Sequence, residues 1–422
     1  MSISATTPLT GFDRFELPEP LLRGIKAAGF QDPWPIQLET IPAGLEGRDV
    51  LGLAQTGTGK TAAFALPLLN RFLEPHRKGP GALVLAPTRE LATQIAEEFQ
   101  TLAKFTRIKV VTIYGGVSIL HQVKALRQRP EIVVGCPGRI LDLLQQGLLR
   151  LDRIEALVLD EADHMFDMGF LPDLRRILAV LPSPRQNLLF SATMPKEIRG
   201  LANNLLKKPH VVETASSAPA TTIDHSLYMV DEQQKRALLE HVLADDKCNS
   251  AIIFTRTKHR ARRLADQLSK AGHRAIGLQG NLSQAQRDRA MRGFRTRRYD
   301  ILVATDIAAR GIDVSGVSHV INFDVPNTPL AYTHRIGRTG RAALEGVAFT
   351  FVTGEDQLWV NATERMIGAS IPRRQAEGFD LKVEKTPVTH PMSRNSASGS
   401  RSRSASRRQR KKTTTHARKT SP

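Results

Sequence analysis

The chain has 422 residues, too many for one ordinary core, and 41% of them are hydrophobic, so two packed domains with flanking segments are expected. A formal net charge of +19 and an isoelectric point near 10.3 favour a polyanionic partner such as nucleic acid, although basic surfaces also serve solubility. No apolar run approaches the ~18 residues of a membrane span, no secretion signal is apparent at the start, and the two distant cysteines fit a reduced compartment, so we expect a cytoplasmic protein without a membrane partner.

Short apolar runs recur through the first half of the chain, and each leads directly into a loop of small, polar or charged residues. These runs are 50–53, 82–86, 110–114, 132–136, 156–159 and 188–190. Longer stretches with helical periodicity, such as 90–105, lie between them. This alternation predicts a parallel sheet covered on both faces, and in such sheets ligands bind beyond the carboxyl ends of the strands.

A glycine-containing loop follows the first predicted strand. Its glycines let backbone N–H groups converge on phosphate oxygens, Lys60 places a positive charge at the outer phosphates, and the hydroxyl of Thr61 is a candidate Mg²⁺ ligand. Ala54 stands where the strict phosphate-loop pattern has its first glycine, and a plain glycine turn before a helix is the alternative. The residues expected to hold the nucleotide are Gln55, Thr56, Gly57, Thr58, Gly59, Lys60 and Thr61.

Two carboxylates follow the apolar run 156–159 directly. Asp160 is expected to hold Mg²⁺, and Glu161 is then available to orient and deprotonate an attacking water. Two surface acids at a strand end are the alternative, which the apolar residues before them weaken. Together with the glycine loop, these carboxylates predict nucleotide hydrolysis.

A third carboxylate, Asp163, is expected to contact another strand-end loop. The sixth predicted strand runs into Ser191 and Thr193, whose hydroxyls can donate to a carboxylate. We therefore expect Asp163 to bond both hydroxyls and to couple hydrolysis to that loop.

The second half of the chain repeats the architecture of the first. The segment 214–222 is small, polar and contains proline, which predicts a linker, and apolar runs resume at 251–254, 275–278, 301–304, 319–323 and 347–352. No second phosphate loop is present. We therefore predict an α/β fold with two tandem parallel-sheet domains, 1–213 and 223–384, and one nucleotide in the cleft between them.

Arginines recur three residues apart at Arg335, Arg338 and Arg341. Such a basic loop is usually a solvated face or a phosphate contact. The transition state at a phosphate site needs positive charge, and an arginine finger contributes about 10³ to 10⁵ in rate. We expect Arg338 and Arg341 to reach the γ-phosphate when the cleft closes, whereas His334 by itself is typical of a buried histidine.

The composition changes at the C-terminal end, where 385–422 is predicted to be a disordered basic tail because it cannot bury enough apolar surface to offset its chain entropy. Residues 393–422 contain no Asp or Glu and supply +10 of the +19 net charge through Arg394, Arg401, Arg403, Arg407, Arg408, Arg410, Lys411, Lys412, Arg418 and Lys419. The tail is expected to bind a nucleic-acid partner loosely and in a salt-sensitive way.

Together these sequence motifs resemble those of the DEAD-box family of ATP-dependent RNA helicases, particularly its bacterial branch. The resemblance covers most of the chain, from about Phe12 to Thr353. The resemblance implies that each domain is RecA-like. The segment 29–37 is similar to the family's adenine-reading motif, so 12–37 is expected to form that site, with Phe12 stacking on adenine and the Gln37 amide reading its edge. Phe12 by itself is typical of a core residue.

Further positions take their expected roles from the same resemblance. It implies a ribose role for Asp313 and phosphate contacts for Arg338 and Arg341. It implies RNA-backbone contacts for Thr88, Arg89, Gly116, Gly138, Arg139, Gly280 and Thr305. Hydroxyls, arginines and exposed glycine N–H groups bind phosphates without reading sequence. The chain departs from the family pattern at Trp34 and Cys136, where threonine is usual, and at Gln279, where histidine is common; none of these removes a catalytic group.

The resemblance implies ATP and Mg²⁺ as cofactors, and RNA, single-stranded or duplex, as the partner. ATP and RNA together would close the cleft, and hydrolysis would reopen it, so that RNA duplexes and RNA–protein complexes are unwound or remodelled locally with little sequence preference. A DNA translocase on the same fold and a non-catalytic RNA-binding or annealing protein are the alternatives. Proteins of ribosome assembly or RNA decay are the further partner classes that this family suggests.

Overall fold

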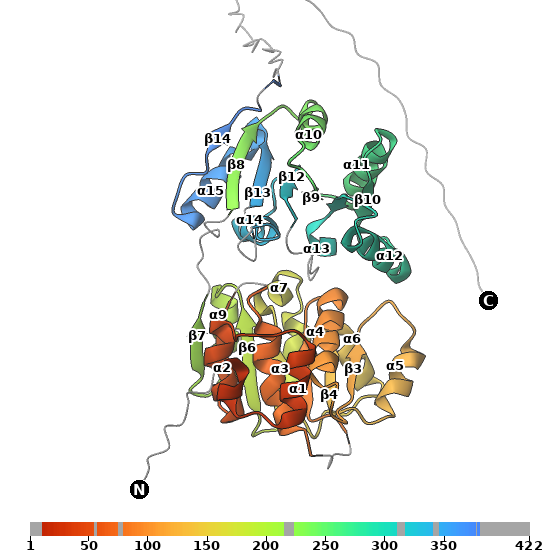
Figure 1. Cartoon of the computed structure of the whole chain (residues 1–422), viewed down its shortest axis with the longest axis vertical. Coiled ribbons are helices and arrows are strands. Elements are labelled where there is room, and N and C mark those ends of the chain that lie inside the picture. The colour runs from red at the N-terminus through yellow and green to blue at the C-terminus, as the bar shows by residue number, and fades with distance from the viewer. Residues whose placement is uncertain are drawn as a thin grey trace, which may run out of the picture. The chain divides into compact units, whose positions relative to one another are not determined.

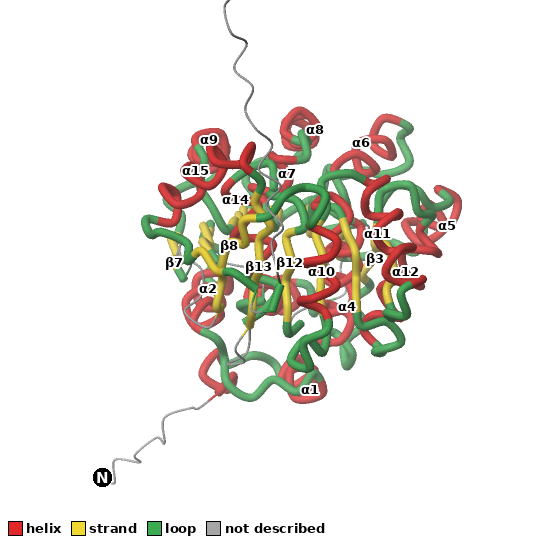
Figure 2. The backbone as a smooth tube through the Cα atoms, turned by 90° about the horizontal axis from the view of Figure 1, so that it is seen from above, coloured by secondary structure: helices red, strands yellow, loops and turns green. Residues whose placement is uncertain are grey.

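The computed structural model describes residues 11–54, 57–74, 79–214, 223–309, 317–340, 346–376 and 378–379. Within these ranges the chain forms two seven-stranded sheets, and every strand pairing is parallel. Figure 1 labels the elements, and Figure 2 shows the strands with helices on either side of them. We call 11–214 the first lobe and 223–379 the second lobe.

The first lobe has the strand order β3-β4-β2-β5-β6-β1-β7. Its strands are β1 (Val50–Leu53), β2 (Ala82–Leu85), β3 (Val110–Ile113), β4 (Ile132–Gly135), β5 (Ala156–Leu159), β6 (Gln186–Ser191) and β7 (His210–Glu213). Its helices are η1 (Gly11–Phe15), α1 (Glu19–Ala27), α2 (Pro35–Leu45), α3 (Lys60–Arg71), α4 (Arg89–Leu102), α5 (Ile119–Leu126), α6 (Pro137–Gln145), α7 (Ala162–Asp167), α8 (Leu171–Val180) and α9 (Lys196–Leu205).

Alternation along the central strands builds two cores in the first lobe, one on each face of the sheet. In β5, Ala156 and Val158 join the cluster that contains Phe64 of α3, whereas Leu157 and Leu159 join the cluster that contains Ile140 of α6. All four residues of β5 are buried, as the continuous apolar run predicts for a strand covered on both faces.

The second lobe repeats this arrangement with the order β10-β11-β9-β12-β13-β8-β14. Its strands are β8 (Ile223–Met229), β9 (Ala251–Phe254), β10 (Ala275–Leu278), β11 (Ile301–Ala304), β12 (His319–Asn322), β13 (Gly346–Val352) and β14 (Arg373–Arg374). Its helices are α10 (Lys235–Leu243), α11 (Lys258–Lys270), α12 (Gln284–Arg295), α13 (Asp306–Ala309), α14 (Pro329–Ile336), η2 (Gly354–Asp356) and α15 (Gln357–Ile367).

The predicted architecture of two parallel-sheet domains is confirmed, and the structure adds β7, β8 and β14, which the sequence interpretation did not include. Almost all of the predicted linker and the whole predicted tail 385–422 lie outside the described residues. Of the linker, only Thr214 is described, and its N–H donates to the carbonyl of Leu53 at 2.9 Å.

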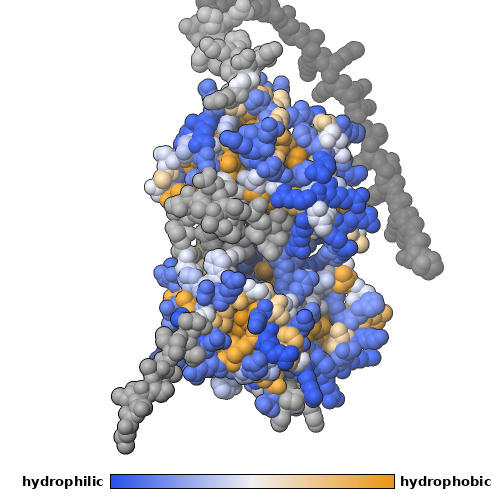
Figure 3. Space-filling model, in the orientation of Figure 1, coloured by the Kyte–Doolittle hydropathy of each residue, from blue (hydrophilic) through white to orange (hydrophobic). Residues whose placement is uncertain are grey.

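The surface of the first lobe is mainly hydrophilic on the face drawn in Figure 3, with apolar patches over its helices. Trp34 and Leu120 are among the large apolar side chains that the structure leaves exposed. No helix in the described ranges is long and apolar enough to span a membrane.

Candidate active site and nucleic-acid groove

The loop between β1 and α3 places a lysine beyond the carboxyl end of β1. Gly57 and Gly59 have φ angles of 86° and 82°, a region that glycine enters without a Cβ penalty. Lys60 opens α3, is 5% exposed, and its Nζ donates to the Ala54 carbonyl at 3.1 Å. A left-handed glycine turn at a helix N-terminus, with a cation beside it, is suited to phosphate oxygens. Of the predicted nucleotide residues, Gln55 and Thr56 lie outside the described residues, whereas Thr58 and Thr61 are described.

The strand-end carboxylates lie against this lysine. Asp160 Oδ1 is 3.6 Å from Lys60 Nζ and accepts the Glu161 N–H at 2.9 Å. Asp160 and Glu161 are 2% and 3% exposed. Burial raises the pKa of the Asp160 carboxyl, although the Lys60 ammonium opposes that shift. The predicted pairing of phosphate-loop lysine and strand-end aspartate is therefore present in space.

Glu161 occupies an unusual backbone position. Its φ of 52° and ψ of 52° lie in the left-handed region, which non-glycine residues seldom adopt outside turns and functional sites. Burial alone would raise the pKa of this carboxyl, but the neighbouring His164 and Lys60 outweigh burial and hold the pKa well below its usual range. These neighbours favour the ionised form of Glu161, the form that a general base needs.

Asp163 joins the strand-end loop after β6, as the sequence predicts, but with different partners for the two hydroxyls. The Thr193 hydroxyl donates to Asp163 Oδ2 at 2.9 Å, and the Thr193 N–H donates to the same oxygen at 3.0 Å. The Ser191 hydroxyl instead accepts the backbone N–H of Asp163 at 3.2 Å and donates to the Thr193 carbonyl at 2.7 Å. The contact of Ser191 is thus with the Asp163 backbone, since its own hydrogen is already committed.

The predicted adenine segment packs against the phosphate loop. Gln37 is fully buried; its Nε2 donates to the Gly59 carbonyl at 3.0 Å, and its Oε1 accepts the Trp34 N–H at 2.9 Å. Trp34 is 50% exposed. Phe12 is only 5% exposed and packs against Phe15 and Phe30, with ring centroids 5.8 and 5.9 Å away. Stacking of Phe12 on adenine stays a prediction, to be weighed against this core position.

Arg335 and Arg338 of the second lobe lie three residues apart and have different surroundings. Arg335 is 2% exposed and donates to both carboxylate oxygens of Asp306 at 2.5 and 2.7 Å, and also to Asn322 and to the Asp324 carbonyl. Arg338 lines a small cavity with His164 and His334, and its charge also lowers the pKa of Glu161. Arg341 and Asp313 lie outside the described residues.

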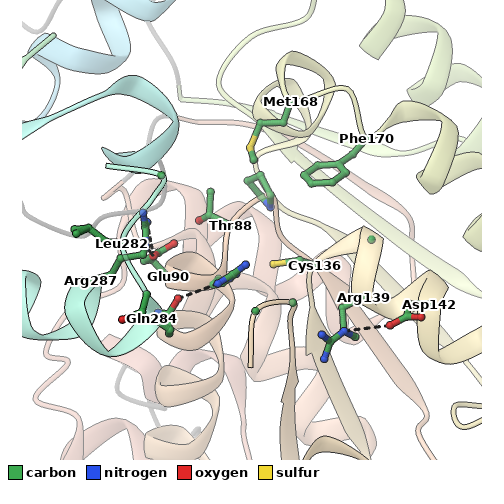
Figure 4. A pocket seen from close by; sticks show the side chains of 17 residues that line it. Thr88, Glu90, Cys136, Arg139, Asp142, Met168, Phe170, Leu282, Gln284 and Arg287 are labelled. Carbon is green, nitrogen blue, oxygen red and sulfur yellow. Dashed lines mark hydrogen bonds and ion pairs between the residues drawn. The ribbon is translucent and has the colours of Figure 1, made fainter. Parts of the chain in front are cut away.

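A second, larger cavity of about 660 Å³ lies beside the N-terminal ends of α4 and α12. Figure 4 shows its lining, which comes from both lobes. Six of the seven predicted RNA-contact residues line it: Thr88, Arg89, Gly116, Gly138, Arg139 and Gly280. Thr305 is described but does not line this cavity.

Side-chain pairs cross this groove, and the sequence interpretation did not include them. Arg287 Nε donates to Glu90 Oε1 at 2.8 Å, and Arg89 Nη1 donates to Gln284 Oε1 at 3.2 Å, as the dashed lines in Figure 4 mark. A Cβ on Gly116 would overlap the Arg89 guanidinium in its present position, and the φ of 76° at Gly116 favours glycine. Each pair joins residues almost 200 positions apart, so local patterns carry no signal for them.

Comparison with known proteins decides the family. Residues 34–201 match the model for the DEAD/DEAH box helicase, and 234–343 match the helicase conserved C-terminal domain. The chain belongs to the DEAD-box family of ATP-dependent RNA helicases. It is 44% identical over 377 residues to the DEAD-box ATP-dependent RNA helicase CshA of Bacillus cereus (strain ATCC 10987 / NRS 248), covering 89% of this chain and 72% of that relative. CshA of Bacillus subtilis (strain 168) is also 44% identical, over 374 residues, which are 88% of this DEAD-box chain and 76% of that relative.

Solved helicase structures share both lobes and confirm the RecA-like fold. Dbp5 of S. cerevisiae bound to RNA and ADP BeF3 is 35% identical with a TM-score of 0.79, and the match covers 87% of this chain and 96% of Dbp5. Mss116p bound to ssRNA and AMP-PNP is 29% identical with a TM-score of 0.79, and the match covers 89% of this chain and 81% of Mss116p.

Proposed function

We propose that this DEAD-box protein hydrolyses ATP to ADP and phosphate and uses the cycle to unwind or remodel short stretches of RNA, with little sequence preference. The observation that carries this proposal is the buried contact between Lys60 and Asp160, with the buried carboxyl group of Glu161 beside them. A phosphate-binding cation, a metal-binding carboxylate and a base are the parts that phosphoryl transfer to water requires.

The residues at the loop fit an ATP–Mg²⁺ complex. Mg²⁺ is usually held by one or two carboxylates, a hydroxyl, waters and the phosphates themselves, and Asp160 and Thr61 supply the protein share. When bound, the ion neutralises charge on the β- and γ-phosphates. Lys60 would leave the Ala54 carbonyl for the phosphates, while the Gln37 amide, already fixed beside Gly59, would read the adenine edge.

The chain's own residues would then carry the hydrolytic step. Glu161 orients the attacking water and accepts its proton, and Arg338 stabilises negative charge on the transferred group. Arg341 and Asp313 are proposed for γ-phosphate and ribose contacts on the sequence pattern alone. Asp163, through Ser191 and Thr193, would transmit the state of this site to the β6 loop.

The 660 Å³ groove is proposed to hold the RNA backbone. Its lining offers arginines, a hydroxyl and glycine N–H groups, which bind phosphate without reading bases. Discrimination of RNA from DNA is then expected from 2′-hydroxyl contacts. Both cysteines are free, which supports a cytoplasmic location, and we keep ribosome-assembly and RNA-decay proteins as proposed partner classes.

The test compares ATP turnover with RNA and with DNA of the same sequence. We expect RNA to stimulate turnover and DNA to do so far less, and we expect Lys60→Ala to abolish turnover under both conditions. Equal stimulation by DNA would favour the translocase alternative. RNA binding or annealing without any turnover in the unmodified protein would favour the non-catalytic alternative.

A further inference from the structure

His164 is a buried side chain at the hydrolytic site to which the proposed function gives no role. It lies in α7, three residues after Glu161, and is 2% exposed. Its Nδ1 is 2.9 Å from Glu161 Oε2, and its Nε2 is 2.7 Å from His334 Nδ1 of the second lobe. The two rings meet edge-on with centroids 4.3 Å apart. One imidazole thus joins the expected base to the other lobe.

The chemistry of the partners fixes the direction of the first hydrogen bond. Glu161 acts as a base only as a carboxylate, whose oxygens can only accept, so in that role Nδ1 of His164 carries the proton and donates across the 2.9 Å contact. A buried carboxylate without such donors would be costly, and a neutral Glu161 could not act as a base. The contact therefore gives one buried oxygen of Glu161 a donor and holds that oxygen in place.

The direction of the second hydrogen bond follows from Asp163. His334 Nε2 lies 3.9 Å from Asp163 Oδ2. If His334 Nδ1 donated to His164, its Nε2 lone pair would face that carboxylate. If His334 Nδ1 accepts instead, a proton on its Nε2 faces the carboxylate. We therefore assign hydrogen bonds that His164 donates from Nδ1 to Glu161 and from Nε2 to His334 Nδ1, which requires a proton on both nitrogens of His164, an imidazolium cation. Burial and the adjacent His164 lower the pKa of His334 to about 3, in keeping with a neutral acceptor ring.

We propose that His164 is a positioning residue for ATP hydrolysis, which orients Glu161 through Nδ1 and links that orientation to His334 of the second lobe through Nε2. The proposal rests on the proposed function, in which Glu161 activates water. Because the His164 side chain contacts Glu161 and His334 and is proposed to act on ATP only through Glu161, its loss should lower kcat and leave the KM for ATP nearly unchanged. Misplacing a catalytic group by about 1 Å can cost ~10²-fold, so we expect a decrease in kcat of about 10- to 100-fold.

Three substitutions separate the two contacts. His164→Asn keeps an N–H donor near the Nδ1 position, His164→Gln places its amide near the Nε2 position, and His164→Leu provides neither. We expect kcat to fall most in the Leu variant, to recover partly in Asn, and to remain low in Gln. His121→Leu, an exposed histidine of α5 in the same lobe, is the matched control and should turn over ATP normally.

A comparison with Glu161→Gln distinguishes failure of this inference from failure of the proposed function. If His164 acts through Glu161, adding His164→Leu to Glu161→Gln should lower the residual turnover no further. Unchanged kcat in a folded His164→Leu protein, or a full additional loss in the double variant, would overturn the positioning role while Glu161 keeps its own. Normal turnover in Glu161→Gln alone would overturn the role of Glu161 and the inference with it.

If His164→Leu does not fold, as judged by circular dichroism, the Asn and Gln variants decide alone. A higher kcat in Asn than in Gln at equal KM supports the orientation of Glu161 through Nδ1. Equal kcat values in the two variants contradict it.

Discussion

At the scale of single residues, charged neighbours distinguish two equally buried carboxyl groups of the site. Asp160 and Glu161 are adjacent and almost equally buried, yet their pKa values move in opposite directions, because His164 lies against Glu161 and not against its neighbour. The sequence could place both acids at a strand end, but it could not assign their protonation states, since these depend on residues from other elements.

The two thiols are expected to be unreactive in the folded protein. Burial raises the pKa of Cys136 to about 12, with a further contribution from Glu90, and burial raises that of Cys248 to about 12 as well. Because the thiolate is the nucleophile, alkylation by iodoacetamide at pH 8 should be slow in the native protein and fast in urea. Rapid native labelling, followed by peptide mass spectrometry, would contradict this burial.

Phe12 offers a test between two roles that the sequence left open. The resemblance assigns it to adenine stacking, whereas the structure packs its ring against Phe15 and Phe30. From the packing we expect Phe12→Leu, which keeps an apolar side chain but loses ring contacts, to lower the melting temperature. The KM for ATP should stay within about twofold, because a ring packed in the core has no stacking contact with adenine to lose, whereas a lost stacking contact would cost ~1–3 kcal/mol per base.

The opposite result identifies a stacking role. An increase of KM by tenfold or more with an unchanged melting temperature would mean that the ring leaves the core to contact adenine. Thermal unfolding and steady-state turnover on the same preparation distinguish the two outcomes.

At the scale of elements, the central strands were predictable and the edges were not. The run 156–159 is buried at every position, and the predicted bounds equal those of β5. The strand β7 is half exposed and β14 has only two residues, so neither has the continuous apolar run of a buried parallel strand. The strand β8 mixes polar and apolar residues, because it lies near the sheet edge beside β14.

The helix α4 shows how one element serves three purposes. Its N-cap Thr88 accepts the Leu91 N–H at 3.2 Å, Arg89 lines the groove, and Glu90 binds Arg287 of α12. The sequence predicted a helix over 90–105 and the structure has Arg89–Leu102, so the functional residues occupy the first turn. Their partners on α12 became known only from the structure.

The Glu90–Arg287 ion pair is expected to favour the closed arrangement of the lobes. Its side chains are 12–13% exposed, so solvent screens it less than a surface pair. We expect Glu90→Gln and Arg287→Gln each to weaken RNA binding in the presence of a nonhydrolysable ATP analogue. The double variant should show a coupling of about 0.5–3 kcal/mol, measured by fluorescence anisotropy in a double-mutant cycle. Arg289→Gln, on the same helix, is the control. Strictly additive effects would mean that the pair does not contribute to closure.

At the scale of the whole molecule, repetition of one sheet architecture was predictable because each sheet leaves its own periodic signal. What joins the lobes was not. The contacts Glu90–Arg287, Arg89–Gln284 and His164–His334 span 197, 195 and 170 residues of sequence. Such pairs depend on how two folded surfaces meet, and a single sequence contains no local pattern for them.

The charge of the molecule is concentrated in its C-terminal segment. Residues 393–422 supply +10 of the +19 net charge, so their removal leaves +9 on the remainder. Each cation that neutralises a phosphate of single-stranded RNA adds about 0.7 to the slope of log affinity against log salt. Deleting 393–422 should therefore flatten that slope, while kcat at saturating RNA stays unchanged because the hydrolytic residues are all in the lobes.

A variant of full length with the ten basic residues replaced by glutamine separates charge from chain length, and it should behave as the deletion does. An unchanged slope in both variants, measured by anisotropy from low to physiological salt, would mean that this segment makes no contact with RNA phosphate.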